Sequence, residues 1–152
     1  MEYKIALQKA AAYCAQSERA TSEVKEKLQK CGAQNSDIEK IIQKLNDDDF
    51  LNEQRFCNAF AKDKFRFNRW GKTKIAYMLS MKKVEKECIF QAIDSIDDEE
   101  YSAVLTELLK SKSKSLKETD KLQKEQKLFR FAVSRGFEND VIKKCLLVDV
   151  FC

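Results

Sequence analysis

The 152-residue sequence contains no proline and no histidine, and it has only three glycines. Sheet-rich folds such as sandwiches and barrels need many turn residues at short spacing, and proline and glycine are among the best of these. Without histidine, the commonest general base and the serine or cysteine triads that depend on it are excluded. These absences favour a helical fold, and they leave an enzyme with little support.

The glycines and cysteines also lack the spacing of cofactor or metal sites. Gly32, Gly71 and Gly136 are isolated, so no glycine-rich phosphate loop is present. None of the six cysteines stands in a CxxC pair, and the usual kind of zinc site is excluded because histidine is missing. Most cysteines fall at apolar positions of helical patterns, which predicts small, reduced core residues of a cytosolic protein. They are Cys14, Cys31, Cys57, Cys88, Cys145 and Cys152.

No signal peptide or transmembrane span is predicted. The first apolar run has no basic region before it and is interrupted by Lys9 and Gln16. Charged residues make up 36% of the chain and apolar residues 43%, with a net charge of +4, which is typical of a chain that folds. We therefore expect a cytoplasmic protein with no membrane association.

The sequence does contain a repeat of about fifty residues. In each copy, two apolar pairs spaced i, i+4 are separated by a step of ten residues. Two short amphipathic helices joined by a tight turn need this pattern. The matching sets are Val24, Leu28, Ile38, Ile42 and Leu45; Ile75, Leu79, Ile89, Ile93 and Ile96; and Leu128, Ala132, Ile142 and Leu146.

The expected turns agree with the repeat. Gly32 and Gly136 stand just past the first short helix of their copies, where a residue that tolerates positive φ ends a helix at low cost. Lys83 holds the same place in the middle copy. Ser36, followed three residues later by Glu39, has the spacing of a capping box and predicts the start of the next helix.

Two acidic runs precede the longer helices. They are Asp47–Asp49 and Asp97–Glu100. Acidic side chains in a first turn are stabilised by the positive end of the helix dipole, so we interpret both runs as helix-capping residues. A hydrated Mg²⁺ held by such a cluster is the weaker alternative, and we predict no metal or other cofactor.

These patterns predict an all-α fold of nine helices in three tandem three-helix repeats, forming an elongated, curved, solenoid-like body. The expected helices span about 3–15, 22–31, 37–46, 52–67, 71–81, 86–95, 98–115, 120–135 and 139–148. The predicted repeats are residues 1–48, 49–96 and 97–152. Residues 110–117 are poor in apolar side chains and predict a flexible joint between the second and third repeats.

A basic segment interleaved with aromatic rings runs from residue 62 to residue 74. Cations that follow phosphates and rings that stack on bases are the ingredients of single-strand binding. Arginine and aromatic residues are also favoured at the centres of protein interfaces. The third interpretation is that the rings pack a joint between helices while the charges are solvated. The candidate binding residues are Lys62, Lys64, Arg66, Arg69, Trp70, Lys72 and Lys74, with Phe65 and Phe67 between them.

A second basic stretch runs from Lys110 to Arg130, with eight lysines or arginines against three acids. Its first part is most simply a solvated linker. Acidic patches near Asp47 and Asp97 mean that the molecule has both acidic and basic surfaces. Such surfaces are complementary to a groove whose walls carry charges of both signs. The candidate binding residues in this second region are Arg130, Arg135, Lys143 and Lys144.

Residues 51–60 match the pattern Leu-(Asn/Asp)-x-x-Arg-Phe-x-x-x-Phe, and a basic stretch with Gly71 and an Ile-x-x-x-Leu pattern from Ile75 follow. Together with Tyr13, residues 19–28 and residues 128–142, these motifs resemble the RecX family over nearly the whole chain. The order and the threefold repeat make the resemblance specific. One departure is Trp70-Gly71-Lys72, where many members carry a second glycine and a proline.

The resemblance implies a bacterial regulator that binds the recombinase RecA or its filament on single-stranded DNA. Members usually restrain filament growth, ATP hydrolysis and strand exchange, and so act in homologous recombination, DNA repair and the SOS response. It further implies a protein that is not an enzyme. The sequence shows no sustained heptad pattern, which favours a monomer.

The alternative is a nucleic-acid-binding module that acts directly on DNA. The two short helices of each repeat are similar in layout to a helix-turn-helix. Against this, the second of them in the middle repeat begins with Glu85 and Glu87, which DNA phosphates would repel. The sequence is also compatible with a weak direct contact with DNA in addition to protein binding.

Overall fold

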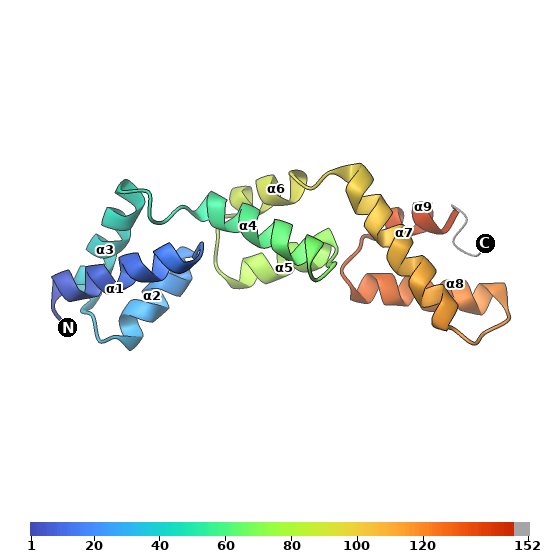
Figure 1. The fold of residues 1–152 in the computed structure, drawn as a ribbon, viewed down its shortest axis with the longest axis horizontal. Helices are drawn as coiled ribbons and strands as arrows, with labels where there is room; N and C mark the ends of the chain where they lie inside the picture. Colours follow the sequence, from blue (N-terminus) through green and yellow to red (C-terminus); the bar gives the residue numbers. More distant parts are fainter. Residues whose placement is uncertain (148–152) are drawn as a thin grey trace. The chain divides into compact units, whose positions relative to one another are not determined.

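The structure is a computed structural model that describes residues 1–147. Within these residues it contains nine α-helices and no strand (Figure 1). The helices are α1 (Tyr3–Gln16), α2 (Thr21–Lys30), α3 (Asn35–Asp47), α4 (Glu53–Arg66), α5 (Lys72–Met81), α6 (Lys86–Asp94), α7 (Asp98–Ser115), α8 (Lys121–Ser134) and α9 (Asn139–Leu147). The prediction of an all-α fold of helical repeats is confirmed, with each described boundary within two residues.

We refer to α1–α3 as the first module, α4–α6 as the second and α7–α9 as the third. The described chain separates into two compact units, and their border runs through the second module. Unit 1 comprises Met1–Phe60 and Met78–Ala92, and unit 2 comprises Ala61–Tyr77 and the chain from Ile93 onward. The repeat boundaries at residues 48 and 96 therefore stay predictions.

In the first module, a stripe of small residues on α1 packs against α2 and α3. Ala6, Ala10 and Cys14 follow the i, i+4 spacing and are buried, and they meet Val24 and Leu28 of α2. Small side chains let neighbouring helices approach closely, so a short module can still exclude water from its core.

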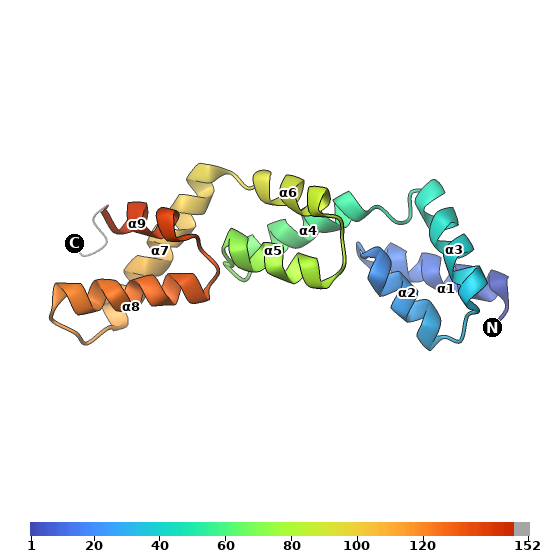
Figure 2. The same cartoon turned by 180° about the vertical axis from the view of Figure 1, so that it is seen from behind.

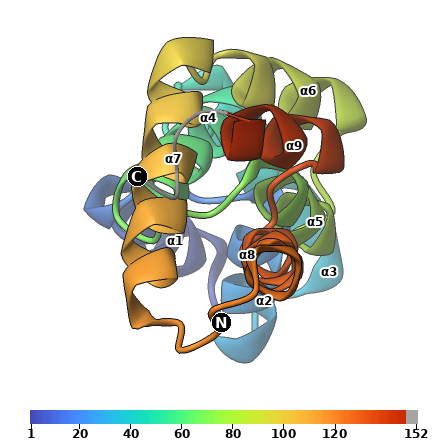
Figure 3. The ribbon, with the colours of Figure 1, turned by 90° about the vertical axis from the view of Figure 1, so that its right-hand side faces the viewer.

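The third module buries its own apolar stripe. Leu105 and Leu109 of α7 are fully buried together with Leu128 of α8 and Ile142 of α9. Figure 3 shows α8 nearly end-on, with α7 running past it and α9 beside both, and Figure 2 shows the turn that leads from α8 to α9. This turn positions the contacts described below.

The turns after α2, α5 and α8 have the predicted left-handed conformation. Gly32 and Gly136 have φ of 83° and 96°, and Lys83 has φ of 58°. After α2, the Ala33 backbone N–H donates to the Leu28 carbonyl at 3.0 Å, and after α8, the Phe137 N–H donates to the Ala132 carbonyl at 3.1 Å. In both cases a hydrogen bond to the carbonyl five residues earlier closes the turn. The repeat therefore extends to the backbone conformation of its turns.

Two predictions about helix starts are wrong. α3 begins at Asn35 after Gln34, so Ser36 lies inside the helix and the Ser36–Glu39 capping box does not form. The run Asp47–Asp49 ends α3 instead of starting α4. The start of α4 is capped by the Asn52 carboxamide, which accepts the Arg55 backbone N–H at 2.9 Å.

The other acidic run does start a helix. The Asp97 carboxylate accepts the Glu100 backbone N–H at 2.9 Å at the beginning of α7.

The prediction of a flexible joint at residues 110–117 is wrong, because residues 110–115 form the last turns of α7 inside the third module. Ser113 is buried there, and the alternating serines do not interrupt the helix because lysine is a good helix former.

Three of the predicted core cysteines, Cys14, Cys57 and Cys145, are buried, whereas Cys31 and Cys88 are half-buried. Cys152 lies outside the described residues, as does the last residue of the helix predicted at 139–148.

None of the described helices is both long enough and apolar enough to cross a membrane.

Candidate partner-binding surface

The basic segment lies in unit 2, where it contacts the turn between α8 and α9 through its backbone. The Gly71 N–H donates to the Arg135 carbonyl at 2.8 Å, and the Thr73 N–H donates to the Gly136 carbonyl at 2.9 Å. A β-carbon at Gly71 would lie 2.2 Å from the Gly136 carbonyl carbon, and one at Gly136 would lie 2.3 Å from Cβ of Lys74. Two glycines are therefore needed where the second module meets the third.

A buried tyrosine connects the same two modules. The Tyr101 hydroxyl of α7 accepts the Lys72 backbone N–H at 2.8 Å and donates to the Glu138 carboxylate. Its ring contacts Phe65 and Phe137, with ring centroids 5.7 Å and 5.1 Å apart. Burial, followed by the hydrogen bond to Glu138, raises the pKa of Tyr101, so its hydroxyl stays protonated and keeps both hydrogen bonds.

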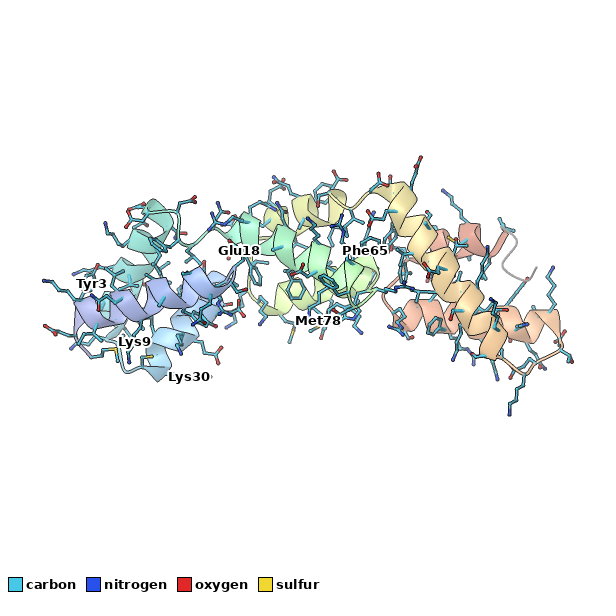
Figure 4. All side chains as sticks on the ribbon, viewed as in Figure 1. Tyr3, Lys9, Glu18, Lys30, Phe65 and Met78 are labelled. Atoms are coloured by element: carbon cyan, nitrogen blue, oxygen red, sulfur yellow. The ribbon has the colours of Figure 1, made fainter. Side chains whose placement is uncertain are left out.

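Phe65 and Phe67 have different roles although they are two residues apart. Phe65, labelled in Figure 4, lies in the last turn of α4. Its side chain is buried, and the residue is 2% exposed. Phe67 follows the helix end and is 81% exposed. Trp70 is half-buried, with the Lys64 and Lys74 ammonium groups 5.1 Å and 4.6 Å from its ring centroid. One ring of the basic segment is thus a packing residue, and another is presented to solvent.

Three further cations of the segment lie against carboxylates of α7. Arg66 lies 3.6 Å from Glu100, and Arg69 lies 3.4 Å from Glu107. The side chain of Lys72 is only 19% exposed, 3.4 Å from Asp98 and 4.6 Å from the centroid of the Tyr101 ring. Lys72 therefore belongs to the contact between modules more than to a free surface.

The remaining candidate residues are distributed over unit 2. Lys62 is exposed on α4, Arg130 is exposed on α8, and Lys143 and Lys144 are exposed on α9. Arg135 meets the basic segment through its carbonyl, and its guanidinium lies 5.4 Å from the ring centroid of Phe131. The structure thus brings Arg135 into contact with the basic segment. It places Arg130 on α8 and Lys143 and Lys144 on α9.

The equivalent elements of the first and second modules also meet in unit 1, through side chains. Ser22, at the second position of α2, donates its hydroxyl proton to the Lys82 carbonyl at 2.6 Å, and Glu23 pairs with the Lys82 ammonium at 3.1 Å. Ser22 of α2 and Thr73 of α5 are equivalent in the repeat, and each contacts the turn of the following module. The Arg55 Nε–H adds a bond that is shared between the two Glu18 carboxylate oxygens, at 2.7 Å and 2.8 Å.

Sequence reasoning missed Tyr101 and Glu138, because nothing in the sequence couples them across 37 residues. The available signal was weak: an aromatic residue with a hydroxyl at an apolar position of a predicted helix needs a hydrogen-bonding partner. Within the described residues, no group of three or more cysteine, aspartate or glutamate side chains is arranged to hold a metal ion.

The fold and its repeated contact define a protein built from tandem three-helix modules. Residues 52–93 match the family model described as "RecX, second three-helix domain", and residues 98–146 match "RecX, third three-helix domain". The chain belongs to the RecX family.

Curated relatives are named regulatory protein RecX. That of Clostridium perfringens (strain 13) is 31% identical over 124 residues, which cover 80% of this chain and 58% of that protein. That of Clostridium botulinum (strain Eklund 17B) is 34% identical over 127 residues, which cover 82% and 59%. The chain therefore spans about three fifths of the length of these relatives.

Two solved structures share the fold. A crystal structure of RecX from Lactobacillus salivarius gives a TM-score of 0.89 at 20% identity, covering 95% of this chain and 94% of that one. A crystal structure of regulatory protein RecX gives 0.86 at 17% identity, covering 95% and 71%.

Proposed function

We propose that this protein is a regulator that binds RecA, or the RecA filament on single-stranded DNA, and restrains its growth, ATP hydrolysis and recombinase activity. The observation that carries the proposal is family membership across the second and third modules. The naming of the relatives as regulatory proteins supports it. In this role the chain needs no catalytic centre and no cofactor, and it acts as a cytoplasmic monomer with modules at 1–48, 49–96 and 97–152.

The surface proposed for RecA is centred on Phe67. This ring is 81% exposed, and a large exposed aromatic residue flanked by cations is a typical anchor of a protein interface. Arg66 and Arg69 flank it, with side chains 52% and 42% exposed. The surface also includes Lys62, Lys64, Trp70 and Lys74, and Arg130, Arg135, Lys143 and Lys144 extend it over the third module.

Direct action on DNA is the second candidate function, and it is supported by the same exposed ring and cations. Two observations weigh against it. Arg66 and Arg69 already lie against carboxylates of α7, so a phosphate would first have to displace them. The first turn of α6, the helix that would enter a groove, carries Glu87.

The test is to add the purified protein, in sub-stoichiometric amounts, to RecA on single-stranded DNA and to follow ATP hydrolysis and filament length. We expect both to fall. A titration of the protein against single-stranded DNA alone, over a range of salt concentrations, runs beside it. If RecA activity is unchanged while a steeply salt-dependent DNA complex forms, the first function is refuted and direct DNA binding takes its place.

A further inference from the structure

Two carboxylates of α7 lie over the exposed arginines of the basic segment. Glu100 and Glu107 are seven residues apart, which places them on one face of the helix. Glu100 contacts Arg66 and Glu107 contacts Arg69, and all four side chains are between 42% and 66% exposed. These pairs are accessible to solvent, so another anionic group can reach the same arginines.

The pairs are not required to hold unit 2 together. The contact between the second and third modules is already made by the Gly71 and Thr73 backbone bonds and by Tyr101. Exposed ion pairs contribute little to stability, because water solvates both partners well when they separate. The arginines can therefore leave Glu100 and Glu107 without opening the core.

We propose that Glu100 and Glu107 are internal competitors that occupy Arg66 and Arg69 until a carboxylate-bearing protein surface replaces them. This inference rests on the proposed function, since the competing surface is that of the RecA filament. The internal ligands are carboxylates, and a partner that supplies carboxylates in the same positions replaces each pair with an equivalent one. The two glutamates thus lower the affinity of the surface and restrict it to partners that match their spacing.

The test compares two double variants that remove the same charge from the same unit. E100Q/E107Q removes both competing carboxylates. E99Q/D94N is the matched control, because Glu99 and Asp94 are exposed and have no charged partner among residues 1–147. Affinity of wild type and both variants for the RecA filament on single-stranded DNA is measured at one physiological salt concentration, with single-stranded DNA alone as a second arm.

We expect E100Q/E107Q to bind the filament between about twofold and thirtyfold more tightly than wild type, the fold-change to which two exposed ion pairs correspond. We expect the control E99Q/D94N to change the affinity by less than E100Q/E107Q does. The midpoint of thermal unfolding of E100Q/E107Q is expected to fall slightly, so affinity and stability move in opposite directions.

Three results would overturn the inference, and they are distinguishable. If wild type binds the filament and the two double variants bind alike, the competition is refuted while the proposed function stands. If only binding to DNA alone is tightened, the group that replaces the glutamates is a phosphate and not a protein carboxylate. If neither wild type nor either variant binds the filament, the proposed function itself fails.

Discussion

At the scale of single residues, two glycines with the same backbone conformation have different surroundings. Gly32 and Gly136 both have positive φ, but a β-carbon at Gly32 would meet no atom within 4 Å. At Gly136 it would lie 2.3 Å from Cβ of Lys74 and 2.7 Å from its backbone nitrogen. Alanine substitutions at these two glycines therefore separate the loss of stability caused by backbone strain from the loss caused by disturbing the contact between modules.

We expect Gly32→Ala to lower the free energy of unfolding by about 0.5–1 kcal/mol, because about 1–2 kcal/mol of left-handed strain is partly offset by the smaller entropy of the unfolded chain. Gly136→Ala should lower it by about 1.5–4 kcal/mol, because overpacking adds to the same strain. Urea unfolding followed by far-UV circular dichroism measures both, and Trp70 fluorescence reports unit 2. Equal losses for the two variants would show that the Gly136 contact contributes nothing.

Cys57 makes stability depend on pH in the alkaline range. Burial, with a smaller contribution from neighbouring Cys88 and Glu53, raises the pKa of Cys57 to about 12 from an ordinary value of 9.0. Above the ordinary value the unfolded thiol has lost its proton while the folded thiol has kept it. The unfolded state then binds fewer protons, so the free energy of unfolding falls as pH rises.

We therefore expect the free energy of unfolding to decrease as pH rises from about 9 toward about 12, and to decrease less steeply in Cys57→Ala. The variant is less stable at every pH because of the cavity, so the slope is the quantity to compare. Urea titrations at several pH values give that slope. If the wild-type and Cys57→Ala slopes coincide, the Cys57 thiol does not cause the loss.

At the scale of helices, one turn of the repeat lacks the residue that its conformation favours. Lys83 has φ of 58° where the other modules have glycine. Lys83→Gly should remove about 1–2 kcal/mol of strain and add about 0.5–1 kcal/mol of unfolded-chain entropy, a net stabilisation of about 0.5 kcal/mol. Lys83→Ala keeps the β-carbon and is the control. A gain in unfolding midpoint for alanine equal to that for glycine would contradict this explanation.

The helices and their turns could be predicted from the sequence because each depends on neighbouring residues. The i, i+4 pairs of Val24 and Leu28 and of their repeats mark buried faces, and Gly32 and Gly136 mark turns. The failures were also local. Asp47–Asp49 precedes a long helix, but the chain stays helical through Asp47, so the acids fall at the end of α3.

The candidate surface was only partly predictable, because its composition is local but its contacts are not. The cations and rings of residues 62–74 are visible in the sequence. That Phe65 packs on Tyr101, or that Lys72 is held by Tyr101 and Asp98, depends on residues about 26 to 36 positions away. Substituting Lys72 would therefore disturb the contact between modules and would not cleanly test binding.

At the scale of the whole molecule, equivalent elements of the repeat meet twice. The start of α2 contacts the turn after α5 in unit 1, and the start of α5 contacts the turn after α8 in unit 2. Both junctions thus join the second helix of one module to the turn of the next, through a side-chain hydroxyl in unit 1 and backbone N–H groups in unit 2. Because the chain spans about three fifths of the length of its curated relatives, what it does by itself has to be measured on this chain.

We propose that this RecX family member binds the RecA filament through the surface around Phe67. The most direct measurement is the affinity of Phe67→Ala for RecA on single-stranded DNA, compared with Phe90→Ala, which removes a ring that is 66% exposed on α6. We predict that Phe67→Ala weakens binding by about tenfold or more and that Phe90→Ala changes it less than about twofold. Equal affinities for wild type and Phe67→Ala would contradict the account.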